Sequence, residues 1–305
     1  MIKGIFYKIP PSRKFFIALF FILTSFFVMY IIGILFVQVG FKVNIISNPE
    51  ILNDLNNKTS VNVLKFFQLI LSIGLFTIPP FIIGYFFYYS VSDFLRLKKM
   101  PIPYYIILSI IAVISFIPFT NFLSYMNNLI HLPTWLNKVE QWMQTSENNA
   151  NKLTVLFLEA HSLPELLYNI FLIALVPSVG EELLFRGVFQ RIFTEWFKNY
   201  HLGIWISAIL FSLIHFQFYG FLSRLFLGAS FGYLLEITKN MWLPILTHFV
   251  NNLVGVLIAY FISPEKMINT NFYNFSFIEF IYAILGLLVG IACFWLIAKK
   301  AKRIL

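Results

Sequence analysis

The segment that decides the fold of this chain runs from Val179 to Gly187 and reads Val-Gly-Glu-Glu-Leu-Leu-Phe-Arg-Gly. It places two carboxylates and a guanidinium within a run of residues that is otherwise apolar enough to cross a membrane. One acidic side chain at the centre of a membrane helix costs about 2.5 to 3.5 kcal/mol, so partners or water must compensate for these charges. The segment therefore predicts a membrane-embedded helix bundle that encloses a polar cavity.

The composition of the whole chain supports a membrane protein. Hydrophobic residues make up 59% of the sequence and charged residues only 11%, whereas soluble domains carry about 25% charged residues. Because a membrane-crossing helix needs about 20 apolar residues, we predict an all-α polytopic protein with about eight transmembrane helices. The expected spans are residues 15–39, 64–90, 103–126, 166–193, 203–221, 223–238, 242–262 and 277–298.

The basic residues predict the orientation of these spans. Lys and Arg accumulate in cytoplasmic loops, and with both termini in the cytoplasm fourteen of them lie inside, against seven, Arg224 among them, in outer loops. We therefore expect a multi-pass protein of the cell membrane with both termini cytoplasmic. The net charge of +9 then indicates contact with anionic lipid headgroups. No basic stripe with interleaved aromatic residues indicates a nucleic-acid partner.

The polar residues are distributed unevenly along this single membrane domain. Residues 1–126 form a three-span scaffold region that is almost entirely apolar, whereas residues 166–305 contain spans four to eight and nearly all the polar residues expected within the membrane. Residues 127–165 between them carry Trp135 and Trp142 at helical spacing. Since Trp is enriched at membrane interfaces, this outer loop is expected to form an amphipathic helix that covers the bundle.

The start of the charged segment resembles a helix N-terminus. Pro177 and Ser178 stand ahead of Glu181 in the arrangement of a capping box, which predicts a discontinuous span four with Glu181 near the positive end of a helix dipole. Glu182 and Arg186 are four residues apart and can pair. Glu181 points about 100° away from its neighbour, so we expect one carboxylate to be neutralised locally and the other to be free.

Two histidines and an asparagine on other spans complete a set of groups for hydrolysis. His248 and Asn252 are four residues apart, so they share a helix face and can donate hydrogen bonds to one oxygen atom, as an oxyanion requires. His215 and the free carboxylate can polarise a water molecule, with the carboxylate as general base. This set predicts attack of water on an amide without a Ser or Cys nucleophile.

These residues form three motifs with ordered spacing. The motifs are Glu-Glu-x-x-x-Arg at Glu181, Glu182 and Arg186, Phe-x-x-x-His at Phe211 and His215, and His-x-x-x-Asn at His248 and Asn252. In this order they resemble the CPBP family of CAAX proteases and bacteriocin-processing enzymes, which are multi-pass glutamic-type intramembrane proteases. The resemblance covers roughly residues 175–255.

The resemblance implies an intramembrane endopeptidase that uses no cofactor and no metal. In that reading Glu181 activates water with the assistance of His215, His248 and Asn252 stabilise the oxyanion, and the Glu182–Arg186 pair supports the site. The implied partners are the lipid bilayer and a peptide or membrane-protein substrate, in a family that includes bacteriocin maturation and self-immunity proteins. The oligomeric state is left open.

Three other interpretations of the same residues compete with proteolysis. Buried ion networks also clamp helices together, so the protein could be a non-catalytic immunity or scaffolding factor. Chains of Glu and His also relay protons in transporters, although no internal repeat is visible here. A zinc site on one carboxylate and two histidines is disfavoured because the chain has no His-Glu-x-x-His motif.

Overall fold

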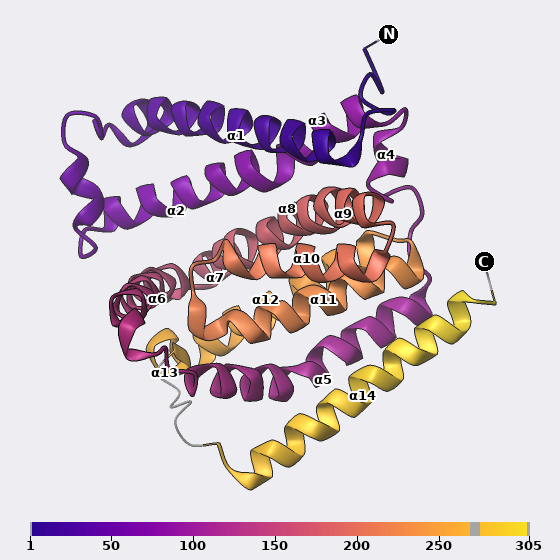
Figure 1. Cartoon of the computed structure of the whole chain (residues 1–305). Helices are drawn as coiled ribbons and strands as arrows, with labels where there is room; N and C mark the ends of the chain where they lie inside the picture. Colours follow the sequence, from indigo (N-terminus) through magenta and orange to yellow (C-terminus); the bar gives the residue numbers. More distant parts are fainter. Residues whose placement is uncertain (1, 269–274, 304–305) are drawn as a thin grey trace.

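The computed structural model describes residues 2–268 and 275–303, and these form an all-helical bundle without strands (Figure 1). Seven helical segments among them are long and apolar enough to cross a membrane. The predicted all-α, multi-pass fold is therefore confirmed. The seven segments are Pro11–Phe41, Lys58–Phe87, Pro103–Asn128, Leu163–Phe197, Phe218–Thr238, Trp242–Phe261 and Phe277–Ala301.

Several of these segments join α-helical stretches through wider π-helical turns. The π-helical stretches are η1 (Val37–Phe41), η3 (Ile73–Thr77), η5 (Ile170–Leu175) and η6 (Leu183–Phe189), and the short 3₁₀ turns are η2 (Pro49–Asn53), η4 (Thr134–Leu136) and η7 (Phe218–Gly220). The α-helices are α1 (Pro11–Phe36), α2 (Lys58–Ser72), α3 (Ile78–Phe87), α4 (Val91–Phe94), α5 (Pro103–Asn128), α6 (Asn137–Leu158), α7 (Leu163–Asn169), α8 (Val176–Glu182), α9 (Gln190–Phe197), α10 (Tyr200–Leu213), α11 (Phe221–Thr238), α12 (Trp242–Phe261), α13 (Pro264–Ile268) and α14 (Phe277–Ala301).

The predicted fifth span, residues 203–221, is wrong in its extent. The helix α10 starts after Asn199, whose side chain accepts the backbone N–H groups of the first turn, and it ends at Leu213 after only 14 residues. Phe216 follows with a left-handed backbone, φ 52°, which a helix cannot continue. Figure 1 shows α10 beside α11, with both chain ends at the same end of the bundle.

The predicted break in span four is also wrong, because Leu163–Phe197 is one continuous helical segment. Ser178 caps nothing: its hydroxyl donates to the carbonyl of Leu175 at 2.9 Å, and α8 has no side-chain cap. Glu181 therefore lies inside a helix and not at the positive end of a dipole. The π-helical turn η5 precedes Pro177, so the chain passes the proline without starting a new helix.

Small residues bring the helices of the bundle into close contact. The helices α5 and α14 lie side by side at the base of the bundle in Figure 1. A Cβ atom at Gly286 would overlap the carbonyl oxygen of Ser115, and one at Gly290 would overlap the ring of Phe116. Small residues allow membrane helices to approach in this way.

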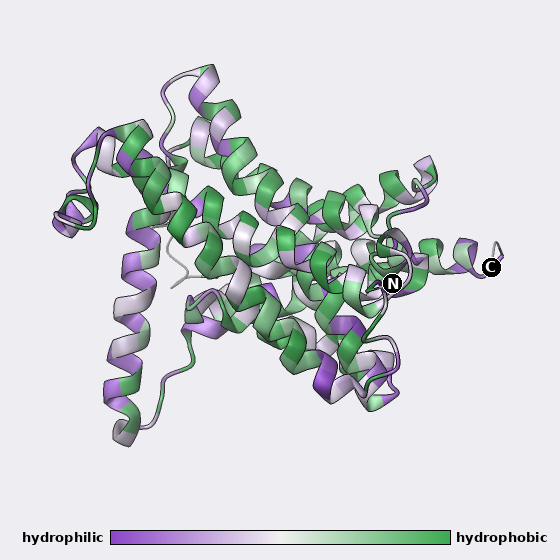
Figure 2. Ribbon diagram, turned by 90° about the horizontal axis from the view of Figure 1, so that it is seen from above, coloured by the Kyte–Doolittle hydropathy of each residue, from purple (hydrophilic) through white to green (hydrophobic). Residues whose placement is uncertain are grey.

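The helix α6 is the most hydrophilic long element. In Figure 2 most helices are hydrophobic along their lengths, whereas α6, at the left edge of the view, carries many hydrophilic residues. The ring of Trp142 packs against Phe216 and Phe218, with centroids 6.5 and 5.1 Å away. An amphipathic helix in residues 127–165 is therefore present and covers the turn after α10, while its place at the outer membrane surface stays a prediction.

The close approach of α5 and α14 yields a stability prediction. Gly286→Ala should lower the thermal unfolding temperature of the purified protein, because overpacking costs about 1–3 kcal/mol. Gly255→Ala is the matched control, since a Cβ at this helical position meets no atom within 4 Å and alanine is the better helix former by about 1 kcal/mol. Equal unfolding temperatures for the two variants would contradict the prediction.

Candidate active site

The centre of the site is the carboxylate of Glu182, which is completely buried. Its Oε1 atom lies 2.8 Å from Nη1 of Arg186, so the predicted pair four residues apart is present. The same oxygen lies 2.8 Å from Nδ1 of His248 on α12. The guanidinium also donates from Nη2 to the carbonyl of Gly228 on α11 at 3.0 Å. One buried ion pair thus connects three helices.

Glu181 occupies a different environment from its neighbour. Its side chain is almost buried, and its Oε2 atom lies 3.8 Å from Nε2 of His248. This distance is longer than the 2.7–3.2 Å of a direct hydrogen bond, and polar groups at such a separation are commonly bridged by water. Glu182 forms an ion pair with Arg186, whereas Glu181 faces the imidazole of His248 without a direct hydrogen bond.

The imidazole of His248 is oriented by its contacts. A carboxylate oxygen only accepts hydrogen bonds, so Nδ1 of His248 donates to Glu182 and Nε2 is directed towards Glu181. The ring stacks on Phe231, with centroids 5.4 Å apart and planes inclined by 28°. These contacts hold Nε2 beside the carboxylate of Glu181.

The prediction that His215 lies within a membrane-spanning helix is wrong, because this residue lies in the turn that follows α10. Its Nδ1 atom is 2.7 Å from the carbonyl oxygen of Phe211 in the last turn of the helix. A carbonyl only accepts, so Nδ1 carries a proton and Nε2 of the neutral ring holds a free lone pair. The ring of Phe211 contacts both imidazoles, with centroids 5.0 Å from His215 and 5.9 Å from His248.

Asn252 lies one turn after His248 on α12, and its amide compensates for a proline. Pro177 has no N–H group, so the carbonyl four residues earlier, that of Ile173, lacks its usual helical donor. Nδ2 of Asn252 lies 3.4 Å from this carbonyl oxygen. An amide group has two hydrogens, so the second remains available for another acceptor.

The predicted residues thus form a connected core with two partners at its edge. Glu181, Glu182, Arg186, Phe211 and His248 contact one another directly. Among the residues that the structure describes, no ion pair joins the histidine after α10 to either carboxylate. His215 contacts the ring of Phe211, and this ring in turn contacts His248.

One residue of the site, Arg224, was missed by the sequence reasoning. It was placed in an outer loop, but it lies on α11 inside the segment Phe218–Thr238. Its guanidinium donates to the backbone carbonyl and side chain of Gln217, while its Nε atom is buried without a partner in the described structure. Its positive charge acts on Glu181 and His215. The position of Arg224 in the first turn of the predicted span 223–238 was the sequence signal that could have indicated a charge within the membrane.

The helix α6 reaches this region through Glu147. A carboxylate oxygen of Glu147 accepts the backbone N–H of Tyr219 at 3.3 Å, and the positive charge of Arg224 also acts on this carboxylate. Burial raises the pKa of Glu147 above its ordinary value. The contact between α6 and the segment after α10 therefore includes Glu147, a partly buried titratable group.

The described residues, 2–268 and 275–303, contain no cluster of three or more His, Cys, Asp or Glu side chains that could hold a metal ion. The absence of such a cluster does not test whether the protein uses a metal or a cofactor, so that expectation remains a prediction.

The comparisons with known proteins concern the same part of the chain. Residues 163–254 match the family described as type II CAAX prenyl endopeptidase Rce1-like. The resemblance to the CPBP family is confirmed. The chain is also 28% identical over 86 residues to the uncharacterized protein YpbD of Bacillus subtilis (strain 168), a match that covers 27% of this chain and 41% of that protein. No solved structure matches significantly.

The family match spans α7 to the first two thirds of α12, and so includes every predicted site residue. It supports a membrane protease. Scaffold helices α1 to α5 lie outside the matched region, as expected from the absence of motifs there.

The buried pair yields a prediction that separates structure from chemistry. Glu182→Gln should destabilise the protein by about 3–5 kcal/mol, because it leaves Arg186 buried without a counter-charge. Combining Glu182→Leu with Arg186→Met should cost less than the sum of the two single changes, measured by thermal unfolding in detergent. Additive losses would show that the ion pair is not the source of the stability.

The raised pKa of Glu147 predicts a pH dependence. A carboxyl group whose pKa is raised on folding contributes stability that is complete below its unfolded pKa, near 4.5, and is lost as the pH rises through its folded pKa. Glu147→Gln keeps an acceptor for Tyr219 but cannot ionise. The unfolding temperature of the variant relative to wild type should therefore increase from about pH 5 to about pH 8, and a constant difference would contradict this.

Proposed function

We propose that this protein is an intramembrane endopeptidase of the glutamic type, which hydrolyses a peptide bond with water activated by Glu181 and without a metal. The observation that carries the proposal is the different use of two adjacent carboxylates. Glu182 is paired with Arg186 and His248, whereas the carboxylate of Glu181 lies 3.8 Å from Nε2 of His248 without a direct hydrogen bond.

In the proposed first step, Glu181 removes a proton from water as the water oxygen attacks the carbonyl carbon of the scissile amide. His215 assists as an acceptor, because its Nδ1–H is already donated to a backbone carbonyl and its Nε2 is free. The step forms a carbon–oxygen bond and moves the carbonyl π electrons onto the oxygen. The proton held by Glu181 then passes to the amide nitrogen as the carbon–nitrogen bond breaks.

The negative oxygen of the tetrahedral intermediate needs donors close to the attacking water. In the proposed arrangement these are Nε2 of a protonated His248 and the free amide hydrogen of Asn252. The gap between Glu181 and His248 supports this assignment, because the base and an oxyanion donor then lie on either side of the reacting carbon. The charge of Arg224 adds further positive potential near Glu181.

The proposed substrate is a peptide or a segment of a membrane protein. The site lies in the apolar bundle, which suits a chain segment that is itself apolar and enters from the bilayer or beneath α6. Processing of a bacteriocin-type peptide or a self-immunity role fits this substrate class. Localisation in the cell membrane with cytoplasmic termini remains part of the proposal, supported by the shared position of both chain ends in Figure 1.

A non-catalytic scaffolding or immunity role is the second candidate, and one observation favours it. The Glu182 network joins α8, α11 and α12, and that clamp would persist without any reaction. The two candidates differ at Glu181, which contributes no ion pair with Arg or Lys in the described structure.

The catalytic proposal predicts that Glu181→Gln, His215→Ala and His248→Ala each lower peptide cleavage by about 10²-fold or more. The measurement uses the purified full chain in detergent and a peptide library read by mass spectrometry. Glu181→Gln should unfold near the wild-type temperature, because Gln preserves the shape of the side chain.

Matched controls come from exposed residues of the same types. Glu50→Gln and His161→Ala lie away from the bundle core and should cleave at the wild-type rate. Full cleavage by a folded Glu181→Gln variant would refute the assignment of the base and favour the scaffolding role.

A further inference from the structure

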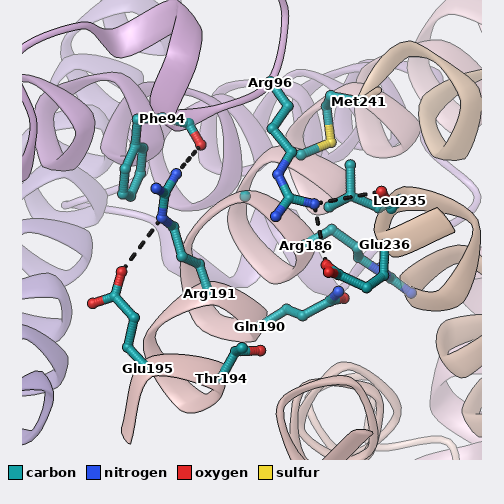
Figure 3. Close-up of a pocket in the computed structure, with 11 residues that line it drawn as sticks. Phe94, Arg96, Arg186, Gln190, Arg191, Thr194, Glu195, Leu235, Glu236 and Met241 are labelled. Carbon is teal, nitrogen blue, oxygen red and sulfur yellow. Dashed lines mark hydrogen bonds and ion pairs between the residues drawn. The ribbon is translucent and has the colours of Figure 1, made fainter. Parts of the chain in front are cut away.

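A polar cavity that is lined in part by Arg186 adjoins the proposed active site. It has a volume of about 220 Å³, and its lining residues (Figure 3) belong to elements near the end of the bundle where both chain ends are marked in Figure 1. Its polar lining comes from the loop after α4, from η6 and α9, and from the end of α11. The charged lining residues are Arg96, Arg186, Arg191, Glu195 and Glu236.

Two arginines from different elements face this cavity. Nη1 of Arg96 donates to the carbonyl of Leu235 at 3.4 Å and to Glu236 at 3.2 Å, as Figure 3 shows. Nη1 of Arg191 donates to the carbonyl of Phe94 at 2.8 Å. A guanidinium has five N–H donors. Among the described residues, the polar contacts of Arg96 use Nη1 and those of Arg191 use Nη1 and Nε, so Nη2 of each group is left for a ligand.

The backbone around Arg96 is held in an uncommon conformation. Its φ angle is 55°, in the left-handed region that non-glycine residues seldom adopt. The N–H of Met241 donates to the carbonyl of Arg96 at 3.1 Å and fixes this turn against the start of α12. The guanidinium is thus positioned by the fold and not by the side chain alone.

Positive charge exceeds negative charge around the cavity. The carboxylate of Glu195 contacts both Lys14 and Arg191, and the carboxylate of Glu236 contacts both Arg96 and Lys239. Two carboxylates are therefore shared among four cations. Arg186 is not counted, because Glu182 neutralises it. Burial, and after it the positive charge of the neighbouring Arg191, lowers the pKa of Arg96 to about 10.

We propose that this cavity binds a phosphate group between the guanidinium groups of Arg96 and Arg191. Arginine forks match the oxygen geometry of phosphate, and an anion between the two would relieve their repulsion. The phosphate can come from the headgroup of an anionic phospholipid or from free inorganic phosphate. The inference is independent of the proposed peptidase activity, because it concerns binding alone.

The cavity also contacts the support of the proposed active site. Arg186 and the following Gly187 line it, and a Cβ on Gly187 would overlap the side chain of Leu95 next to Arg96. A bound phosphate would therefore stiffen the contact between the loop after α4 and η6.

The test measures binding to the full chain in lipid nanodiscs. One arm compares phosphatidylcholine nanodiscs with nanodiscs that also contain phosphatidylglycerol, and counts retained phosphatidylglycerol by native mass spectrometry. The other arm adds inorganic phosphate to the phosphatidylcholine sample and measures the shift of the unfolding temperature against chloride at equal ionic strength. Retention in the first arm identifies a lipid headgroup as the source, and a shift in the second identifies free phosphate.

The variants decide whether the binding uses this cavity. Arg96→Gln and Arg191→Gln should weaken binding about tenfold or more, the usual value of a charged hydrogen bond, whereas Arg13→Gln, an exposed arginine outside the cavity, should bind as wild type. If a Gln variant fails to fold, Arg96→Lys preserves the charge and should bind more weakly than wild type because the fork is lost. Absence of binding in both arms, or equal binding by wild type and all cavity variants, would overturn the proposal.

Discussion

The rest of the structure depends on a single oxygen atom, Oε1 of Glu182, which is approached by both Arg186 and His248 at 2.8 Å. A buried ion pair offsets its desolvation only with good geometry and additional hydrogen bonds. Here the additional bond is made by Gly228 on α11, whose lack of a side chain allows the guanidinium to reach its carbonyl. The position of α11 and α12 relative to the charged helix, and with it the orientation of the imidazole, follows from this requirement.

Irregular helix geometry surrounds this interaction on both sides. The π-helical turns η5 and η6 flank the α-helical stretch Val176–Glu182, and π turns frequently occur at functional sites. Pro177 leaves the carbonyl of Ile173 without its helical donor, and Asn252 supplies one from the neighbouring helix. In a bilayer no water compensates an unpaired backbone carbonyl. The same asparagine thus repairs the helix and presents an amide to the site.

The two ends of the bundle have different chemistry. At one end α6 covers the turn beside His215 through Trp142 and Glu147. At the other end the arginine cavity adjoins Arg186. The candidate site between them is therefore bounded by an amphipathic helix on one side and by a charged cavity on the other.

The sequence by itself determined the all-helical membrane fold and the pairing of Glu182 with Arg186, because hydropathy and a four-residue spacing are local properties of the chain. Motif spacing also predicted the family resemblance, and it selected His248 and Asn252 as candidate site residues. Only the tertiary structure decided that the charged span is continuous, that His215 lies beyond the end of α10, and that Arg224 lies on α11 and not in a loop. These depend on which buried carbonyls and charges find partners on other helices, and such contacts are not encoded in any local pattern.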